Sequence, residues 1–134
     1  MITLTDYWMG RDSEYPLEMT PAIEHNAEIT VNLANQLLTR FGEGRKVRSG
    51  WRPPSVNAKT RGASRTSLHM SGQAIDLEDE DRQLTKWLFS NVGRTALVQL
   101  GLWMEHPTDA PTWVHVQTKP PPSGNRYFYS GVKV

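Results

Sequence analysis

The chain has 134 residues, the size of one domain that can bury a core without disulfides or a structural metal. It contains no cysteine, which excludes a cysteine-ligated zinc ribbon, a thiol nucleophile and a disulfide scaffold. A net charge of +1 argues against broad electrostatic binding of nucleic acid, and no hydrophobic run is long enough for insertion into a membrane.

The N-terminal part of the chain predicts an arm followed by one long helix. Residues 1–19 are expected to pack on the domain as an irregular arm, because Thr5 to Asp12 shows neither a helical nor a strand period. A helix begins at Pro21 with Thr20 as its cap, and Gly42 ends it. Its apolar face recurs every three or four residues. The members of this face are Ile23, Ala27, Val31, Ala34, Leu38 and Phe41.

A short strand and a basic loop are expected next. Val47 begins the strand and Gly50 ends it, because Pro53-Pro54 prevents further ladder pairing. The loop from Ala58 to Arg65 carries three basic residues. We expect a solvated loop, and the alternative is that it forms the rim of a cleft.

A histidine and an aspartate stand seven residues apart in the segment that follows, as His69 and Asp76. Gln73 to Leu77 has the pattern of a strand, on which Gly72, Ala74 and Asp76 share one face. Gly72 allows the backbone to turn, so that His69 folds back over the strand. The two side chains are therefore expected to converge as half of a metal site.

The remaining elements are two short helices and a hairpin. Four acids, Glu78 to Asp81, favour a helix N-terminus over a second metal site, since a calcium loop needs alternating ligands and a glycine. Asn91 to Leu100 predicts a second helix, which Gly101 stops. Leu102–Glu105 and Trp113–Gln117 then predict a hairpin with a long loop.

The second hairpin strand supplies a third metal ligand. Val114 and Val116 are apolar and alternate with a face that presents His115. Together with His69 and Asp76, this residue offers two nitrogens and one carboxylate oxygen. That mixture suits zinc and leaves a fourth position open for water, so one Zn²⁺ per chain is expected.

These residues resemble a known family of zinc peptidases. Ser67 to Asp76 matches the pattern Ser-x-His-x-x-Gly-x-Ala-x-Asp, which is followed downstream by a histidine on a strand, here His115. This is the pattern of the D-alanyl-D-alanine carboxypeptidase and L-alanyl-D-glutamate endopeptidase family. Ser49-Gly50-Trp51-Arg52 and Asn57 look like its Ser-Gly-Tyr-Arg segment. The resemblance is strong between Val47 and Gln117 and loose in the N-terminal helix.

The resemblance also implies substrate-binding residues. The arginine that matches Arg52 binds the peptide substrate in this family, and a planar guanidinium suits a carboxylate or a carbonyl. Ser67, a fixed position of the motif, is expected to bind substrate as well. Arg48 is the competitor of Arg52, although its place in a strand favours a structural ion pair.

Glu105 is the expected catalytic base. It closes the strand that pairs with the His115 strand, and one branch of the family places a glutamate there. Other branches place the acid three residues before the last histidine, where this chain has Thr112. Asp109 and His106, in the hairpin loop, are the alternatives.

We therefore expect a single α+β domain, 1–134, with helices packed on a small, mostly antiparallel sheet and zinc on its exposed face. Residues 119–134 are expected to form an extended tail, which is exposed from Lys119 to Gly124 and packs back onto the body through Tyr127, Phe128 and Tyr129. The resemblance implies hydrolysis of an amide bond in peptidoglycan stem peptides. The scissile bond stays open between the carboxypeptidase and endopeptidase types. The alternatives are a non-catalytic zinc-binding module and a phage structural protein of the same fold.

The short form of the chain looks most like bacteriophage and prophage members of the family, which implies an endolysin. Met1 to Asp6 lacks a basic region followed by an apolar core, so we expect no signal peptide. The enzyme would be made in the cytoplasm and reach the cell wall after holin-type release or as a virion-carried protein. We expect a monomer.

Overall fold

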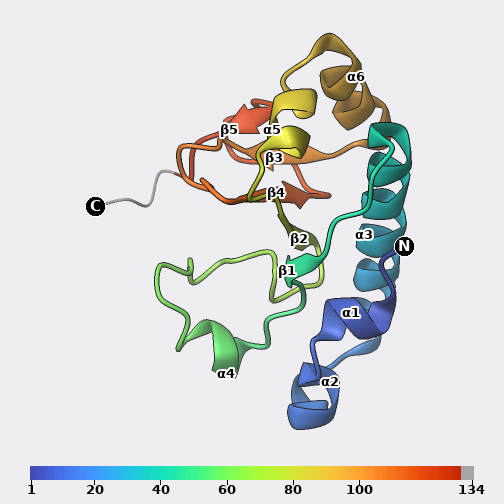
Figure 1. Ribbon diagram of the computed structural model, residues 1–134. Coiled ribbons are helices and arrows are strands. Elements are labelled where there is room, and N and C mark those ends of the chain that lie inside the picture. Colours follow the sequence, from blue (N-terminus) through green and yellow to red (C-terminus); the bar gives the residue numbers. More distant parts are fainter. Residues whose placement is uncertain (131–134) are drawn as a thin grey trace.

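The fold is built around a five-stranded sheet in the computed structural model, which describes residues 1–130 (Figure 1). The strands are β1 (Val47–Ser49), β2 (Ala74–Glu78), β3 (Trp103–Glu105), β4 (Trp113–Gln117) and β5 (Tyr127–Phe128), in the order β1-β2-β4-β3-β5. β5 pairs with β3 in parallel, and the other pairs are antiparallel. The expected α+β class with a mostly antiparallel sheet is therefore confirmed.

The long helix α3 (Pro21–Phe41) packs along the sheet and carries most of the helical core face. Thr20 caps it by accepting a hydrogen bond at its hydroxyl from the amide of Ile23, as the sequence predicted. Its buried face is wider than the predicted stripe, because Thr30 and Leu37 are also buried. The buried hydroxyl of Thr30 donates a hydrogen bond to the carbonyl of Gly72, in the turn before β2.

The N-terminal arm is helical, so the expectation of an irregular arm is wrong. It forms three short segments, α1 (Leu4–Trp8), α2 (Arg11–Glu14) and the 3₁₀ turn η1 (Pro16–Glu18). Each segment is too short to show a period in the sequence, and α1 depends on a capping box between Thr3 and Asp6. Tyr7 is fully buried and donates a hydrogen bond to the carbonyl of Ala74, 2.7 Å away. The arm is therefore part of the core behind β2.

The acidic run starts a helix, as predicted, through two of its four residues. Asp81 accepts a hydrogen bond at its carboxylate from the amide of Gln83, at 3.0 Å. Asp79 accepts hydrogen bonds at its carboxylate from the amides of Leu84 and Thr85, at 3.0 and 2.8 Å, at the start of α5 (Gln83–Leu88). Glu78 belongs to β2 instead. The helix α6 (Asn91–Leu100) follows with the bounds that were predicted, and Gly101 stops it in a left-handed conformation.

The hairpin and the segments around it leave one side of the sheet open. Met104 on β3 pairs with Val116 on β4, and both side chains are buried. Figure 1 shows α3 on one side of the sheet, whereas the loop between the short helix α4 (Pro54–Asn57) and β2 extends on the other side. Within residues 1–130, no helix combines the length and the apolar character needed to cross a membrane. Residues 131–134 of the predicted tail lie outside the described part of the chain.

Candidate metal centre

His69, Asp76 and His115 lie together on the open side of the sheet. Asp76 and His115 are paired residues of β2 and β4, and His115 Nδ1 lies 2.9 Å from Asp76 Oδ1. His69 Nε2 lies 3.4 Å from Asp76 Oδ2. One ligand atom from each of the three residues falls within 4.8 Å of the others. The structure thus brings together all three residues that the sequence predicted as metal ligands.

A tight turn places His69 over the strand. Gly72 has φ +77°, and a Cβ there would lie 2.9 Å from the carbonyl oxygen of Ile23 on α3. The hydroxyl of Thr30 donates a hydrogen bond to the carbonyl of Gly72, at 2.7 Å, and holds the turn against α3. The predicted role of Gly72 in folding His69 back is therefore confirmed.

A backbone carbonyl orients the His69 ring. The carbonyl oxygen of Gly50 lies 2.9 Å from His69 Nδ1 and can only accept, so Nδ1 carries a proton and donates it. Nε2 is then the nitrogen that faces Asp76 and that, in the neutral ring, is able to bind a metal. Gly50 is held closely, because a Cβ there would lie 2.0 Å from the carbonyl oxygen of Tyr7. This orienting group could not be predicted from the sequence, because every residue type has a backbone carbonyl.

The three side chains are strongly coupled in the absence of a metal. Burial disfavours the Asp76 carboxylate, but the charge of His69 and hydrogen bonds from His115 and His69 outweigh burial and lower the pKa of Asp76 well below its usual range. Burial also disfavours the His115 imidazolium, but the hydrogen bond and charge of Asp76, with the charge of Glu105, raise the pKa of His115 to about 9. Asp76 therefore stays ionised, which suits a cation.

The donor set fits zinc. Two imidazole nitrogens and one carboxylate oxygen form a common three-residue set in catalytic zinc sites, where the fourth position stays open. The open direction exists here, because the cluster lines a cleft of about 850 Å³. Both histidines also have a hydrogen-bond partner at the nitrogen that faces away from Asp76, as metal-binding histidines usually do.

Glu105 lies in the same cleft. It ends β3, one position beyond the pair Met104 and Val116, which in an antiparallel register places it beside the His115 strand. Its side chain lines the cleft together with the metal cluster, and its charge raises the pKa of His115. The expected pairing of the two strands is confirmed.

The two alternative bases have other contacts. Asp109 lines the cleft, and its Oδ2 accepts a hydrogen bond from the amide of Ser130 at 2.9 Å. His106 stacks on Tyr129, with ring centroids 4.4 Å apart, and its Nδ1 lies 2.9 Å from the Thr108 hydroxyl. Both side chains are thus tied into the hairpin loop and the C-terminal segment.

Arg52 is buried in the cleft wall with one donor unused. Its Nη1 donates to Asn57 Oδ1 at 3.1 Å, and its Nη2 lies 3.5 Å from Ser49 Oγ. Its Nε is buried and has no hydrogen-bond partner within residues 1–130. Burial lowers the pKa of Arg52 from its ordinary value, and the charge of Asp76 opposes that shift. The guanidinium is therefore fixed in the cleft wall, where the charge of Asp76 reaches it, and it contains one buried N–H without a partner among the described residues.

Ser67 and Arg48, the other two predicted participants, also line the cleft. The Ser67 hydroxyl accepts a hydrogen bond from the amide of His69 at 3.2 Å, so it also supports the turn. Arg48 lies over the Trp113 ring at 4.4 Å and 4.0 Å from Glu78, which matches the ion pair expected from its place in the strand.

Two segments that looked peripheral in the sequence form cleft walls. Residues 60–64, expected to be a solvated loop, line the cleft with Arg61 among them, so the alternative of a rim is correct. Residues 119–123 line it as well, and Pro121 is buried, so the expectation of a fully exposed segment from Lys119 to Gly124 is wrong. Both placements depend on packing between distant segments, for which the sequence carries no local signal.

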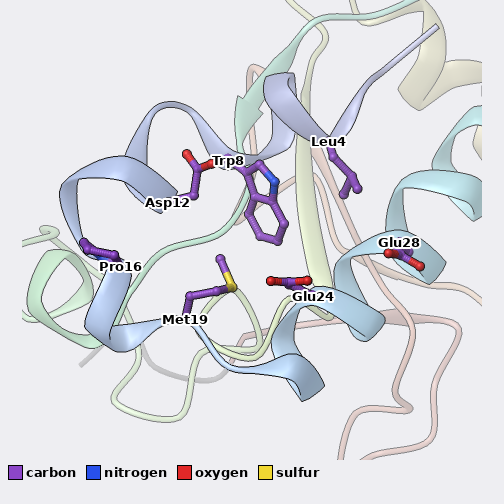
Figure 2. A pocket seen from close by; sticks show the side chains of 7 residues that line it. All are labelled: Leu4, Trp8, Asp12, Pro16, Met19, Glu24 and Glu28. Atoms are coloured by element: carbon purple, nitrogen blue, oxygen red, sulfur yellow. The ribbon is translucent and has the colours of Figure 1, made fainter.

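A smaller hollow of about 380 Å³ lies at the N-terminal arm, away from the metal cluster (Figure 2). Figure 2 shows Trp8 of α1 and Met19 facing each other across it, with Glu24 of α3 at its edge. Trp8, an aromatic residue that the sequence left without a role, thus lies in this hollow.

Comparison with protein families gives one match. The sequence model of the family described as Peptidase M15 matches residues 15–117, which include all three residues of the metal cluster, Arg52 and Glu105. Comparisons with curated proteins and with solved structures give no match.

Proposed function

Because the chain belongs to the Peptidase M15 family, whose members are zinc-dependent peptidases, we propose that it hydrolyses an amide bond in peptidoglycan stem peptides. The observation that carries the proposal is the convergence of His69, Asp76 and His115 in one cleft with Glu105. The resemblance to D-alanyl-D-alanine carboxypeptidases and L-alanyl-D-glutamate endopeptidases supports this substrate class.

One Zn²⁺ would be held by His69 Nε2, His115 Nδ1 and the Asp76 carboxylate. When bound, such an ion lowers the pKa of a water molecule to about 7 and polarises the carbonyl under attack. The hydrogen bond from His69 to the carbonyl of Gly50 keeps Nε2 free for this role. Because metal-binding imidazoles must be neutral, zinc binding would have to displace a proton from His115, whose pKa is raised to about 9.

Glu105 would transfer the proton of the attacking water to the leaving nitrogen. A peptidase needs a carboxylate that accepts a proton from the attacking water and passes it to the leaving nitrogen. Glu105 supports this role by its position in the cleft and by its electrostatic effect on His115. An acid in the cleft beside the metal cluster favours a peptidase over a purely structural zinc module.

Arg52 would position the substrate. Its side chain lines the cleft, and a guanidinium binds a carboxylate or carbonyl oxygen with a planar pair of donors. Stem peptides carry free carboxylates, and three further cations, Arg48, Arg61 and Lys119, line the same cleft. Ser67, beside His69, would contribute a hydroxyl to substrate binding.

We further propose a phage-type endolysin that acts as a monomer on the cell wall after holin-type release or from a virion. The resemblance of Ser67 to Asp76 and of His115 to a family that has phage and prophage members supports the role. The +1 net charge supports a peptide substrate over nucleic acid.

Digestion of purified sacculi tests the function. We expect soluble fragments or released D-alanine with zinc-loaded protein, and mass spectrometry of the new termini identifies the bond. Chelator treatment should abolish cleavage and added zinc should restore it. A zinc-loaded wild-type protein that cleaves neither sacculi nor isolated stem peptides would support the non-catalytic module instead.

A further inference from the structure

Gln117 contacts the His115 ring on the side away from Asp76. Gln117 and His115 are two residues apart on β4 and therefore share one face of the strand. Gln117 is buried, with 7% of its surface exposed. Its Oε1 lies 2.9 Å from His115 Nε2.

A backbone carbonyl sets the orientation of the Gln117 amide. Gln117 Nε2 donates a hydrogen bond to the carbonyl oxygen of Lys119, at 2.9 Å. A carbonyl oxygen only accepts, so the amide nitrogen must face Lys119 and the amide oxygen must face His115. Because Oε1 is also only an acceptor, the proton between the two residues belongs to His115 Nε2.

The two histidines are therefore held in opposite forms. At His69 the carbonyl of Gly50 binds the proton of Nδ1 and leaves Nε2 facing Asp76. At His115 Gln117 binds the proton of Nε2 and leaves Nδ1 facing Asp76. When both rings are neutral, as they must be to bind a metal, each presents to the cluster the nitrogen that its outer partner leaves without a proton.

We propose that Gln117, oriented by the Lys119 carbonyl, is a positioning residue that selects the form of His115 able to bind zinc through Nδ1. The proposal rests on the zinc site of the proposed function. Without the acceptor at Nε2, a neutral His115 can carry its proton on Nδ1 and donate it to Asp76 Oδ1, only 2.9 Å away. In that form the hydrogen bond between His115 and Asp76 occupies one nitrogen ligand and one oxygen ligand. Zinc would then have to break this hydrogen bond and displace its proton before it could bind.

Zinc affinity of three variants tests the proposal, measured by competition with a fluorescent chelator. Gln117→Met keeps an unbranched chain of similar length but removes the amide, and its zinc affinity should fall about 10- to 100-fold. Gln117→Glu keeps an oxygen acceptor for Nε2–H but loses the bond to Lys119, and it should bind zinc more tightly than Gln117→Met. Thr118→Val is the matched control, because its hydroxyl reaches only the carbonyl of Gln73, at 3.5 Å, and wild-type affinity is expected.

Nitrogen NMR of the zinc-loaded wild type gives a readout that needs no variant. His115 should carry its proton on Nε2 and His69 its proton on Nδ1.

A His115 that carries its proton on Nδ1 overturns the proposal, as does wild-type zinc affinity in a folded Gln117→Met. An equal fall in both Gln117 variants indicates a purely structural role and also overturns it. A wild type that binds no zinc contradicts the metal site itself. A wild type that binds zinc but does not cleave stem peptides contradicts only the proposed peptidase function and leaves the role of Gln117 intact.

Discussion

Asp76 on β2 and His115 on β4 are paired across two neighbouring strands, and their side chains meet with Oδ1 and Nδ1 2.9 Å apart. Asp76 and His115 are 39 positions apart in the sequence, so strand pairing, and not closeness in the sequence, brings them together in the metal cluster. A shift of one residue in the pairing would turn His115 to the other face of the sheet and dismantle the site. The buried neighbours Val114 and Val116 oppose such a shift, because they would move from the core towards the cleft.

Glu105→Gln should separate catalysis from metal binding. The change nearly preserves shape and removes none of the three cluster residues, so zinc content and melting temperature should change little. A general base typically contributes about 10²–10⁴-fold, and hydrolysis of stem peptides should fall by that order. Asp109→Asn is the matched comparison, because Asp109 lines the same cleft. A rate that survives in Glu105→Gln and collapses in Asp109→Asn would assign the base to the hairpin loop.

Arg52→Lys should retain zinc but weaken substrate use. An ammonium cannot reproduce the planar set of donors with which Arg52 reaches Asn57 and lines the cleft. We expect a lower kcat/KM on stem peptides, with zinc stoichiometry unchanged. Arg48→Lys serves as the comparison, since Arg48 is exposed over Trp113. An unchanged kcat/KM in Arg52→Lys together with a fall in Arg48→Lys would transfer the substrate role to Arg48.

Gly50→Ala should destabilise the protein and weaken zinc binding together. A Cβ at Gly50 would lie 2.0 Å from the carbonyl oxygen of Tyr7, and the carbonyl of Gly50 itself orients His69. Overpacking of this kind typically costs about 1–3 kcal/mol of stability. Gly44→Ala is the control, because nothing lies within 4 Å of a Cβ there. Urea unfolding and chelator competition measure the two effects, and equal values for both variants would contradict the close packing.

The metal-free protein should lose stability as the pH rises above about 6.5 towards 9. The pKa of His115 is raised from 6.5 to about 9 in the folded state, so its contribution is complete below about 6.5 and is lost as pH rises through 9. The pKa of Asp76 is lowered from 3.8, so its contribution is present above about 4 and is lost at more acidic pH. Urea midpoints of chelator-treated protein should therefore be highest between about pH 4 and 6.5.

Asp76→Asn is the informative variant for this pH dependence, because it removes the partner of His115. Its urea midpoint should no longer fall between pH 6.5 and 9. An exposed histidine, His25, provides the control, and His25→Gln should keep the wild-type profile. A wild-type midpoint that rises over this range would contradict the assigned coupling.

The parts of the fold with a long local period were predictable from the sequence. The three- and four-residue spacing along α3 and the alternation along β4 gave both elements with bounds close to the observed ones. Two of the three cluster residues were predictable for a related reason, because His69, Gly72 and Asp76 lie within one turn and strand whose geometry is local. His115 was predictable from the alternation along its strand and from the resemblance to the family. The arm escaped prediction, since one-turn helices such as α1 are too short for a period.

The groups that orient the cluster depend on contacts between distant segments and were not predictable. Gly50 acts through a carbonyl, which every residue type has, and its place beside His69 depends on packing against Tyr7. Gln117 was recognisable as sharing a face with His115, but its role requires the position of the Lys119 carbonyl. The basic loop shows the same limit, because Arg61 reaches the cleft only through the folded chain.

Zinc content of the purified protein tests the central claim most directly. Atomic emission analysis should find one zinc per wild-type chain, held by His69, Asp76 and His115. The variant with all three residues changed to alanine should contain none. A wild type without zinc after zinc loading, or a triple variant that retains it, would contradict the metal centre on which the proposed function depends.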